Sequence, residues 1–248
     1  MQIIWRGQSC FQIIVARNKG EQTSIVIDPF SETIGLRVPK LEADIVLVTH
    51  DHPDHNNVKA VSGSPFLISG PGEYEIRGVF IQGISSWHDE KEGKERGENT
   101  IYAIEAEDLK LCHLGDLGQK ELTDEQLERI GDIDILMIPV GGVYTISAKE
   151  ALKIMSQIEP KITIPMHYQI PYSGRRPDGP YRLKLKIPKP AGQAGIPVAK
   201  GGDLGIKLDG VDKFLKALGI KSIEPQEKLS IKKKDVLPEE AKIVVLKP

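Results

Sequence analysis

The chain carries six histidines, and three of them fall within one short run, Thr49-His50-Asp51-His52-Pro53-Asp54-His55. The run follows the apolar segment 45–48, which is typical of a buried strand. Two imidazoles separated by one residue just past a strand end can converge on one cation. Asp54 and His55 lie further round the turn and can face a second cation. Neutral imidazole and carboxylate suit Zn²⁺, and also Mn²⁺ or Fe²⁺.

This run cannot complete a metal site alone, because each ion needs three or four protein ligands. The other histidines, His88, His113 and His167, each follow or end a strand-like segment, and Asp116 lies three residues after His113. Loops at the ends of successive strands are where a rigid sheet positions a metal. A closed structural zinc site usually contains cysteines, and the two cysteines of this chain stand in no paired motif.

Short β-rich segments must position most of these side chains. Turn residues bound them, and their alternation in the region 73–84 favours half-buried antiparallel strands. The expected strands are Gln2–Trp5, Phe11–Ala16, Thr23–Ile27, Ile45–Thr49, Glu73–Ile76, Val79–Ser85, Thr100–Glu105 and Lys110–His113. The first half is therefore predicted to be antiparallel β structure.

Helices are expected later in the chain. Thr123 and Ser147 each open a capping box, and the second box precedes a helical stripe of apolar residues over 151–158. A third helix, Val211–Leu218, is predicted to end before Gly219. Between residues 132 and 165 the order is strand, helix, strand. This order of elements predicts an α/β (α+β) sandwich of two sheets with helices outside.

The composition is that of a globular protein. The chain has 248 residues, of which 40% are hydrophobic and 27% are charged, and its net charge is -2, so a disordered chain or a coiled coil is excluded. No basic stripe predicts nucleic-acid binding, and Lys232-Lys233-Lys234 is interpreted as a solvated surface run. No apolar run approaches a membrane span, and the opening residues do not resemble a signal peptide. A cytoplasmic location is expected.

Residues 170–203 form a Pro- and Gly-rich stretch without helical period. Such a long excursion is typical of a lid or a disordered loop. Arg175 and Arg176 lie in it, and a forked guanidinium suits phosphate or carboxylate. These arginines either bind an anionic group of a small-molecule substrate or are simply solvated.

Five motifs together resemble the metallo-β-lactamase superfamily of metal-dependent hydrolases. They are Trp5-Arg6-Gly7-Gln8-Ser9-Cys10-Phe11, Asp28-Pro29-Phe30, the histidine run at 50–55, His113-Leu114-Gly115-Asp116 and Ile164-Pro165-Met166-His167-Tyr168. The subgroup that the chain resembles most is that of the ascorbate-6-phosphate lactonase-like hydrolases. This subgroup also resembles phospholipase D-type members that act on N-acyl phospholipids. The resemblance covers nearly the whole chain and implies one domain, residues 1–248, folded as a four-layer αββα sandwich.

The resemblance also implies a ligand set for two divalent ions, with Zn²⁺ expected. The first ion would be held by His50, His52 and His88, and the second by Asp54, His55 and His167, with Asp116 bridging them.

Other residues are left with supporting roles. His113 competes with His88 for the first ion, but His88 lies 28 residues before Asp116, a spacing that fits the subgroup. His113 would then orient a ligand or touch substrate. Asp28 either orients a ligand or simply ends a strand, and Gln8 stands where the subgroup often has histidine.

Such a centre implies a hydrolase in which a hydroxide shared by the two ions attacks a small ester, lactone or phosphodiester. Asp54 would orient the hydroxide and shuttle a proton, and Tyr168 would donate a hydrogen bond to an oxyanion. The alternatives are a nuclease of the same superfamily, a di-iron oxidoreductase and a non-catalytic binding protein. The near-neutral charge argues against a nuclease, and His52 argues against a di-iron oxidoreductase. The intact ligand set argues against a non-catalytic protein. A homo-oligomer is compatible with the sequence.

Overall fold

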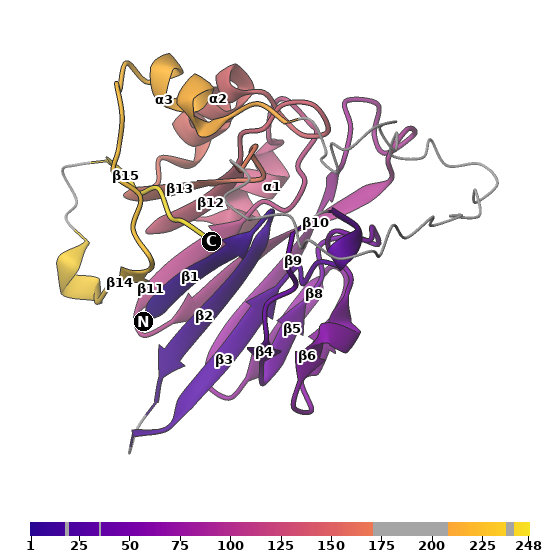
Figure 1. The fold of residues 1–248 in the computed structure, drawn as a ribbon, viewed down its shortest axis with the longest axis vertical. Helices are drawn as coiled ribbons and strands as arrows, with labels where there is room; N and C mark the ends of the chain where they lie inside the picture. The colour runs from indigo at the N-terminus through magenta and orange to yellow at the C-terminus, as the bar shows by residue number, and fades with distance from the viewer. Residues whose placement is uncertain (18–19, 35, 171–207, 237–240) are drawn as a thin grey trace, which may run out of the picture.

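A computed structural model describes residues 1–17, 20–34, 36–170, 208–236 and 241–248. Two sheets are stacked face to face, and three α-helices gather on the outer side of one of them (Figure 1). The stretch beyond residue 170 that was predicted to be a surface excursion, with Arg175 and Arg176, lies outside the described residues. That residues 1–248 form one domain stays a prediction.

The first sheet has six strands. In spatial order they are β14 (Leu229–Ser230), β1 (Gln2–Gly7), β2 (Cys10–Ala16), β3 (Gln22–Ile27), β5 (Ile45–Leu47) and β7 (Phe66–Ile68). β1, β2 and β3 are antiparallel, but β3, β5 and β7 are parallel. The prediction of an antiparallel first half is therefore confirmed for β1, β2 and β3 and wrong for β5 and β7. The connections after β3 and β5 are long enough to cross over, and parallel neighbours need such crossovers.

The second sheet has seven strands. In spatial order they are β15 (Lys242–Ile243), β13 (Ile162–Met166), β12 (Ile135–Pro139), β11 (Leu109–His113), β10 (Glu98–Ala106), β9 (Val79–Trp87) and β8 (Gly72–Ile76). β8 to β11 are antiparallel, whereas β11, β12, β13 and β15 are parallel. The predicted strand–helix–strand unit is confirmed as β12, α2 (Ala148–Ile158) and β13.

The predicted capping boxes are confirmed at α1 (Asp124–Ile130) and α2. In each box a hydroxyl accepts from the third backbone N–H of the helix, and the side chain at that third position accepts from the cap backbone. The third helix is α3 (Val211–Ala217), followed by Gly219 at φ +75°. A residue without Cβ adopts this left-handed conformation readily, which explains the stop at the predicted place.

Side chains alternate between the two faces of the first sheet, and each face belongs to a different apolar cluster. Ile25 and Ile27 face the core between the sheets, while Val26, on the opposite face of β3, belongs to a second cluster with Phe30 and Val46. Strands covered on both faces appear as continuous apolar runs in the sequence. The core that both sheets share confirms the predicted sandwich.

Short elements cover the outer face of the first sheet. They are the 3₁₀ turns η2 (Glu32–Ile34) and η3 (Val58–Ala60) and the two-stranded sheet of β4 (Leu41–Glu42) and β6 (Val61–Ser62). Within the described residues the α-helices thus lie only over the second sheet.

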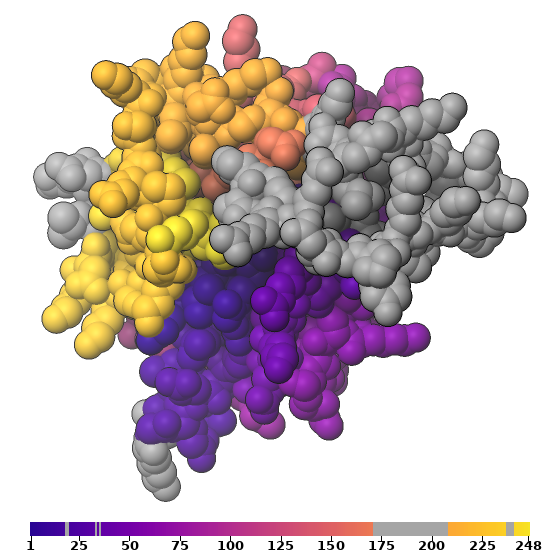
Figure 2. Space-filling view, viewed as in Figure 1, coloured from indigo at the N-terminus to yellow at the C-terminus, as the bar shows by residue number. Residues whose placement is uncertain are grey.

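The N-terminal strands and the C-terminal segment lie side by side on one face of the molecule (Figure 2). Lys232, Lys233 and Lys234 are exposed there, at η4 (Lys233–Asp235), as expected of a solvated run, and Lys233 pairs with Asp134 at 2.8 Å. In the described parts of the chain, every helix is too short or too polar to cross a bilayer.

Tyr102 of β10 connects the two sheets through its buried hydroxyl. The hydroxyl donates to the carbonyl of Val48 at 2.8 Å, lies 3.3 Å from the carbonyl of Ile68, and accepts from Gly70 N at 3.1 Å. We expect Tyr102→Phe to lower the free energy of unfolding by about 1–3 kcal/mol, because buried polar backbone groups lose their partner. Urea denaturation measures this, with Tyr144→Phe as the control. An unchanged midpoint would contradict the bracing role.

Candidate metal centre

Strand direction brings the predicted ligands to one edge of the sandwich. β9 and β11 run the same way because each is antiparallel to β10, and β13 is parallel to β11 through β12. The carboxyl ends of these strands, followed by His88, Asp116 and His167, therefore share an edge. β5 ends just before His50, and the backbone N–H of Thr100 donates to the carbonyl of Thr49 at 2.9 Å, which joins the two sheets there.

The histidine group consists of His50, His52 and His88. Their ligand nitrogens all lie within 4.8 Å of one another. The ring centroids of His50 and His88 are 4.7 Å apart, and those of His52 and His88 are 5.1 Å apart. Nε2 of His50 and Nδ1 of His88 are buried without a hydrogen bond in the described chain. Buried imidazole nitrogens without a protein partner are available to bind a cation.

The protonation of the histidine group suits metal binding. Burial lowers the pKa of His50 well below its usual range and lowers that of His88 to about 4. Burial also lowers the pKa of half-buried His52. All three imidazoles are therefore neutral at pH 7, and a metal requires the neutral form.

The carboxylate group consists of Asp54, His55, Asp116 and His167, whose ligand atoms also lie within 4.8 Å of one another. Burial opposes ionisation of both aspartates, but neighbouring imidazoles hold the pKa of Asp54 and of Asp116 below the usual range. Burial would lower the pKa of His55, yet Asp116, Asp54 and Asp28 raise it well above its ordinary value. The group thus concentrates negative charge that a divalent cation would neutralise.

Asp116 lies between the two groups. Its Oδ2 is 3.2 Å from His55 Nε2 and 3.1 Å from His167 Nε2, both in the carboxylate group, and 3.5 Å from His88 Nε2 in the histidine group. One carboxylate oxygen thus approaches imidazoles from both groups. This is the position from which a carboxylate can bridge two ions.

Asp116 is held by a network that sequence reasoning missed. Its backbone N–H donates to Asn99 Oδ1 at 2.9 Å, and its Oδ1 accepts from Ser9 at 3.2 Å. Gly115 is required in between, because a Cβ there would lie 2.3 Å from Asn99 Oδ1 and 2.8 Å from the Cβ of Thr49. The sequence did not identify Asn99 or Ser9 as functional, because each acts through a contact between segments that are distant in sequence.

Asp28 contacts His55, one of the predicted ligands. Its carboxylate accepts from Thr49 N at 2.8 Å, from Thr49 Oγ1 at 2.7 Å and from His55 Nδ1 at 2.9 Å. The bond to Nδ1 leaves Nε2 of His55 free to face the carboxylate group.

We expect Asp28→Asn to weaken metal binding by the carboxylate group about 10- to 100-fold, because the amide no longer fixes the tautomer of His55. Competition with a chelator measures the affinity. Asp44→Asn, at an exposed ion pair, serves as the control. Equal affinities in wild type and Asp28→Asn would contradict the orienting role.

His113 and Tyr168, both predicted to act in catalysis, point elsewhere. His113 Nε2 lies 2.9 Å from the carbonyl of Ser9, and its Nδ1 accepts from Gly115 N at 3.1 Å, so both ring nitrogens are bonded to backbone. The hydroxyl of Tyr168 donates to the carbonyl of Leu246 at 3.3 Å, and its ring packs on Trp5. Both side chains are buried. They brace the turns beside the centre rather than face it.

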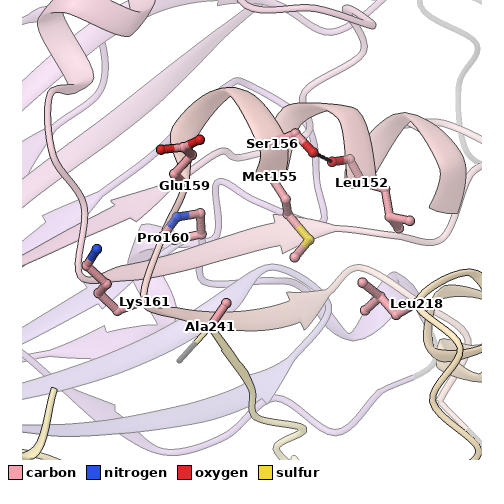
Figure 3. Close-up of a pocket in the computed structure, with 8 residues that line it drawn as sticks. All are labelled: Leu152, Met155, Ser156, Glu159, Pro160, Lys161, Leu218 and Ala241. Carbon is pink, nitrogen blue, oxygen red and sulfur yellow. Dashed lines mark hydrogen bonds between the residues drawn. The ribbon is translucent and has the colours of Figure 1, made fainter. Parts of the chain in front are cut away.

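Two recesses of the described chain lie away from these ligands. One, of about 380 Å³, lies between α2, α3 and the start of β13 (Figure 3). Because His167 follows the other end of β13, this recess is at the opposite edge. A more polar one, of about 230 Å³, is lined by Asp89 and Gly118, close in sequence to His88 and Asp116.

The donor set fits divalent transition-metal ions. It offers imidazole nitrogens and carboxylate oxygens, which Zn²⁺, Mn²⁺ and Fe²⁺ accept, and several of its nitrogens lack partners. Two mixed sheets stacked face to face with such a cluster at one edge define a metallo-hydrolase of the metallo-β-lactamase fold.

Comparison with known proteins agrees with this class. Residues 2–167 match the model of the beta-lactamase superfamily domain. A UPF0173 protein of Pyrococcus abyssi is 32% identical over 202 residues, covering 72% of this chain and 88% of the relative. A UPF0173 metal-dependent hydrolase of Thermococcus onnurineus is 28% identical over 195 residues, covering 68% and 84%.

A solved structure is also similar along nearly the whole chain. It is a protein of Thermotoga maritima described as a candidate zinc-dependent hydrolase of the metallo-β-lactamase superfamily, with 34% identity, a TM-score of 0.69, and coverage of 99% of this chain and 97% of that one. The chain is a metal-dependent hydrolase of this superfamily and belongs to its UPF0173 family.

Proposed function

We propose that the protein is a binuclear hydrolase, with zinc as its metal, that cleaves a small ester, lactone or phosphodiester. Ascorbate-6-phosphate lactonase-like chemistry is included in this range. The observation that carries the proposal is the position of Asp116 Oδ2, within 3.5 Å of imidazoles from both groups. The printed description of the Thermotoga maritima relative supports zinc.

When bound, the ions would supply an activated water and a Lewis acid. The chain's part is to hold them and to manage the proton. Asp54 is 5% exposed, and although burial raises its pKa, the neighbouring imidazoles of His55 and His167 lower that pKa below the usual range. An ionised carboxylate beside the reacting atoms can orient the attacking group and carry a proton to the leaving group.

Thiol nucleophiles are disfavoured in the described chain. Cys10 and Cys112 are both buried, and burial raises the pKa of each thiol. A buried neutral thiol is a poor nucleophile, which supports direct attack by water. Unpaired cysteines are also compatible with the cytoplasmic location that we propose.

The substrate is proposed to be a small anionic molecule. His52 is only half-buried, so the histidine group is the side of the centre open to solvent. Arg175 and Arg176, outside the described residues, are the proposed partners of the anionic group. The net charge of -2 argues against nucleic acid as a substrate.

Two measurements test the proposal. Metal analysis of protein purified without chelator is expected to find close to two transition-metal ions per chain. A panel of bis(p-nitrophenyl) phosphate, lactones, p-nitrophenyl esters and a single-stranded RNA is expected to show turnover of one small-molecule class and none of the RNA. His52→Ala should abolish that turnover, and Gln82→Ala, on β9 and away from the ligands, should not. A wild type free of metal, or unaffected by His52→Ala, would contradict the proposal.

A further inference from the structure

Gln8 lies against the carboxylate group although it belongs to neither set of predicted ligands. Its side chain is buried, with 4% of the residue exposed. The terminal nitrogen, Nε2, donates to Asp54 Oδ2 at 3.1 Å and lies 2.8 Å from His167 Nε2. Its carboxamide therefore contacts two of the four residues of the group directly.

The backbone fixes this side chain in place. Gln8 occupies the turn between β1 and β2 at φ +53°, a left-handed conformation that is uncommon outside glycine. Its carbonyl accepts from Trp5 Nε1 at 2.8 Å and from His167 N at 3.1 Å. A strained conformation held by several contacts is typical of functional sites. The same contacts tie the turn to the segment that carries a ligand.

The spacing of the carboxamide matches that of the donors around it. Within the group, Asp116 Oδ2 is 3.1 Å from His167 Nε2, and Asp54 Oδ2 is 3.4 Å from His55 Nε2. Two atoms each about 2.1 Å from one ion lie roughly 3.0–3.4 Å apart at ordinary coordination angles. The 3.1 Å distance from Gln8 to Asp54 falls within this interval, and the 2.8 Å distance to His167 is slightly shorter. Its terminal atom thus occupies a donor position.

The polarity of the carboxamide must change when a cation is present. Without metal, an N–H group suits the carboxylate of Asp54, while its role toward His167 Nε2 depends on the tautomer of that ring. A bound ion would use the lone pair of the neutral imidazole and repel the N–H dipole. A half-turn about the last side-chain bond exchanges nitrogen and oxygen with almost no change of shape. It puts Oε1, a donor that hard divalent cations accept, in the same position.

We propose that Gln8 Oε1 is a fifth protein donor of the carboxylate group. Five donors exceed the four of a tetrahedral zinc site, so the carboxylate group can accept, besides zinc, an ion of higher coordination number such as Mn²⁺. The histidine group, with three imidazoles and the shared Asp116, keeps a four-donor set. Gln8 therefore tunes which ion the carboxylate group selects. The inference rests on the proposed function only in requiring that this group binds an ion.

The test compares metal binding by wild type, Gln8→Asn and Gln8→Glu. Asparagine tolerates the left-handed conformation but is one carbon shorter, so it withdraws the donor. Glutamate retains an oxygen at full reach and cannot donate an N–H. Gln12→Ala, which removes the side chain bonded to Arg6 and Ser24 on β2, is the matched control. Circular dichroism and thermal unfolding of the metal-free proteins check that each variant folds.

Titrations of metal-free protein with Mn²⁺ and with Zn²⁺, followed by calorimetry, give the readout. Gln8→Asn is expected to weaken Mn²⁺ binding about 10- to 100-fold and Zn²⁺ binding much less. Gln8→Glu should restore Mn²⁺ affinity, and Gln12→Ala should match wild type. With Co²⁺ in place, the visible absorption should rise in Gln8→Asn, because a lower coordination number gives stronger bands.

The same titrations can decide against the inference. Equal Mn²⁺ affinity and an equal Co²⁺ spectrum in wild type and Gln8→Asn would overturn it. Loss in both Gln8→Asn and Gln8→Glu would show that Gln8 acts as an N–H donor to Asp54, not as a ligand. If wild type binds no ion, the proposed function fails as well. If wild type and all variants bound two ions equally well, only the proposed role of Gln8 would be wrong.

Discussion

Asp116→Ala is expected to lower kcat/KM for the substrate identified in the panel by at least about a thousandfold. The substitution removes the oxygen that approaches both groups, so the two ions that we propose would lose their shared ligand. Positioned metal ions contribute several kcal/mol to the stabilisation of a transition state, and about 1.4 kcal/mol corresponds to each factor of ten in rate. Steady-state assays with metal in excess measure the effect.

Two further variants sharpen this result. Asp116→Asn keeps the shape and one oxygen but loses the charge, and it should lower activity almost as far, because a neutral amide bridges two cations poorly. Asp124→Ala, in the first turn of α1, removes a carboxylate outside the two groups and should leave turnover as in wild type. If Asp116→Ala retained wild-type kcat/KM with its metal bound, the bridging role would be wrong.

Removal of metal is expected to lower the unfolding temperature by at least about 10 °C. An ion bound only by the folded state stabilises it by about 4 kcal/mol when its free concentration is a thousand times its Kd. Two such ions give about 8 kcal/mol, and 1 kcal/mol shifts the Tm of a protein of this size by about 2–4 °C. Differential scanning calorimetry after dialysis against chelator, with and without added Zn²⁺, measures the shift.

The physical reason for this shift is the charge left in the metal-free centre. Asp54 and Asp116 are buried, and the imidazoles of His55 and His167 hold the pKa of both carboxyl groups below the usual range. His52→Ala should reduce the response to Zn²⁺, while Tyr144→Phe should preserve it. A Tm that does not respond to Zn²⁺ in wild type would mean that the cluster does not bind the ion in the folded state.

The sequence by itself determined the class of chemistry. The run 50–55 contains three imidazoles and a carboxylate, a combination with few uses other than metal binding. This pattern depends only on local spacing. Local physics also predicted α1 and α2, because their capping boxes need only residues three apart. Local patterns did not predict that β3, β5 and β7 are parallel. The direction of a strand is set by the crossover connection before it and not by the residues of the strand itself.

Tertiary structure decided which histidine faces the cluster. His88 and His113 both come at strand ends, and in the sequence only the spacing implied by the family resemblance favoured His88. In the structure His113 still lies within β11, paired with Tyr102 and Met137, and both of its nitrogens bond to backbone. His88 lies one residue beyond β9, and its nitrogens are left for the centre.

The same holds for Gln8, whose contact with His167 spans 159 residues of chain. A left-handed turn and a backbone hydrogen bond between distant segments create that contact, and no local pattern encodes either. Side-chain types within a short run set what this site can bind, because ligand chemistry is a property of single residues. The assembly of strands from both sheets set which of those residues meet, because that depends on direction and register.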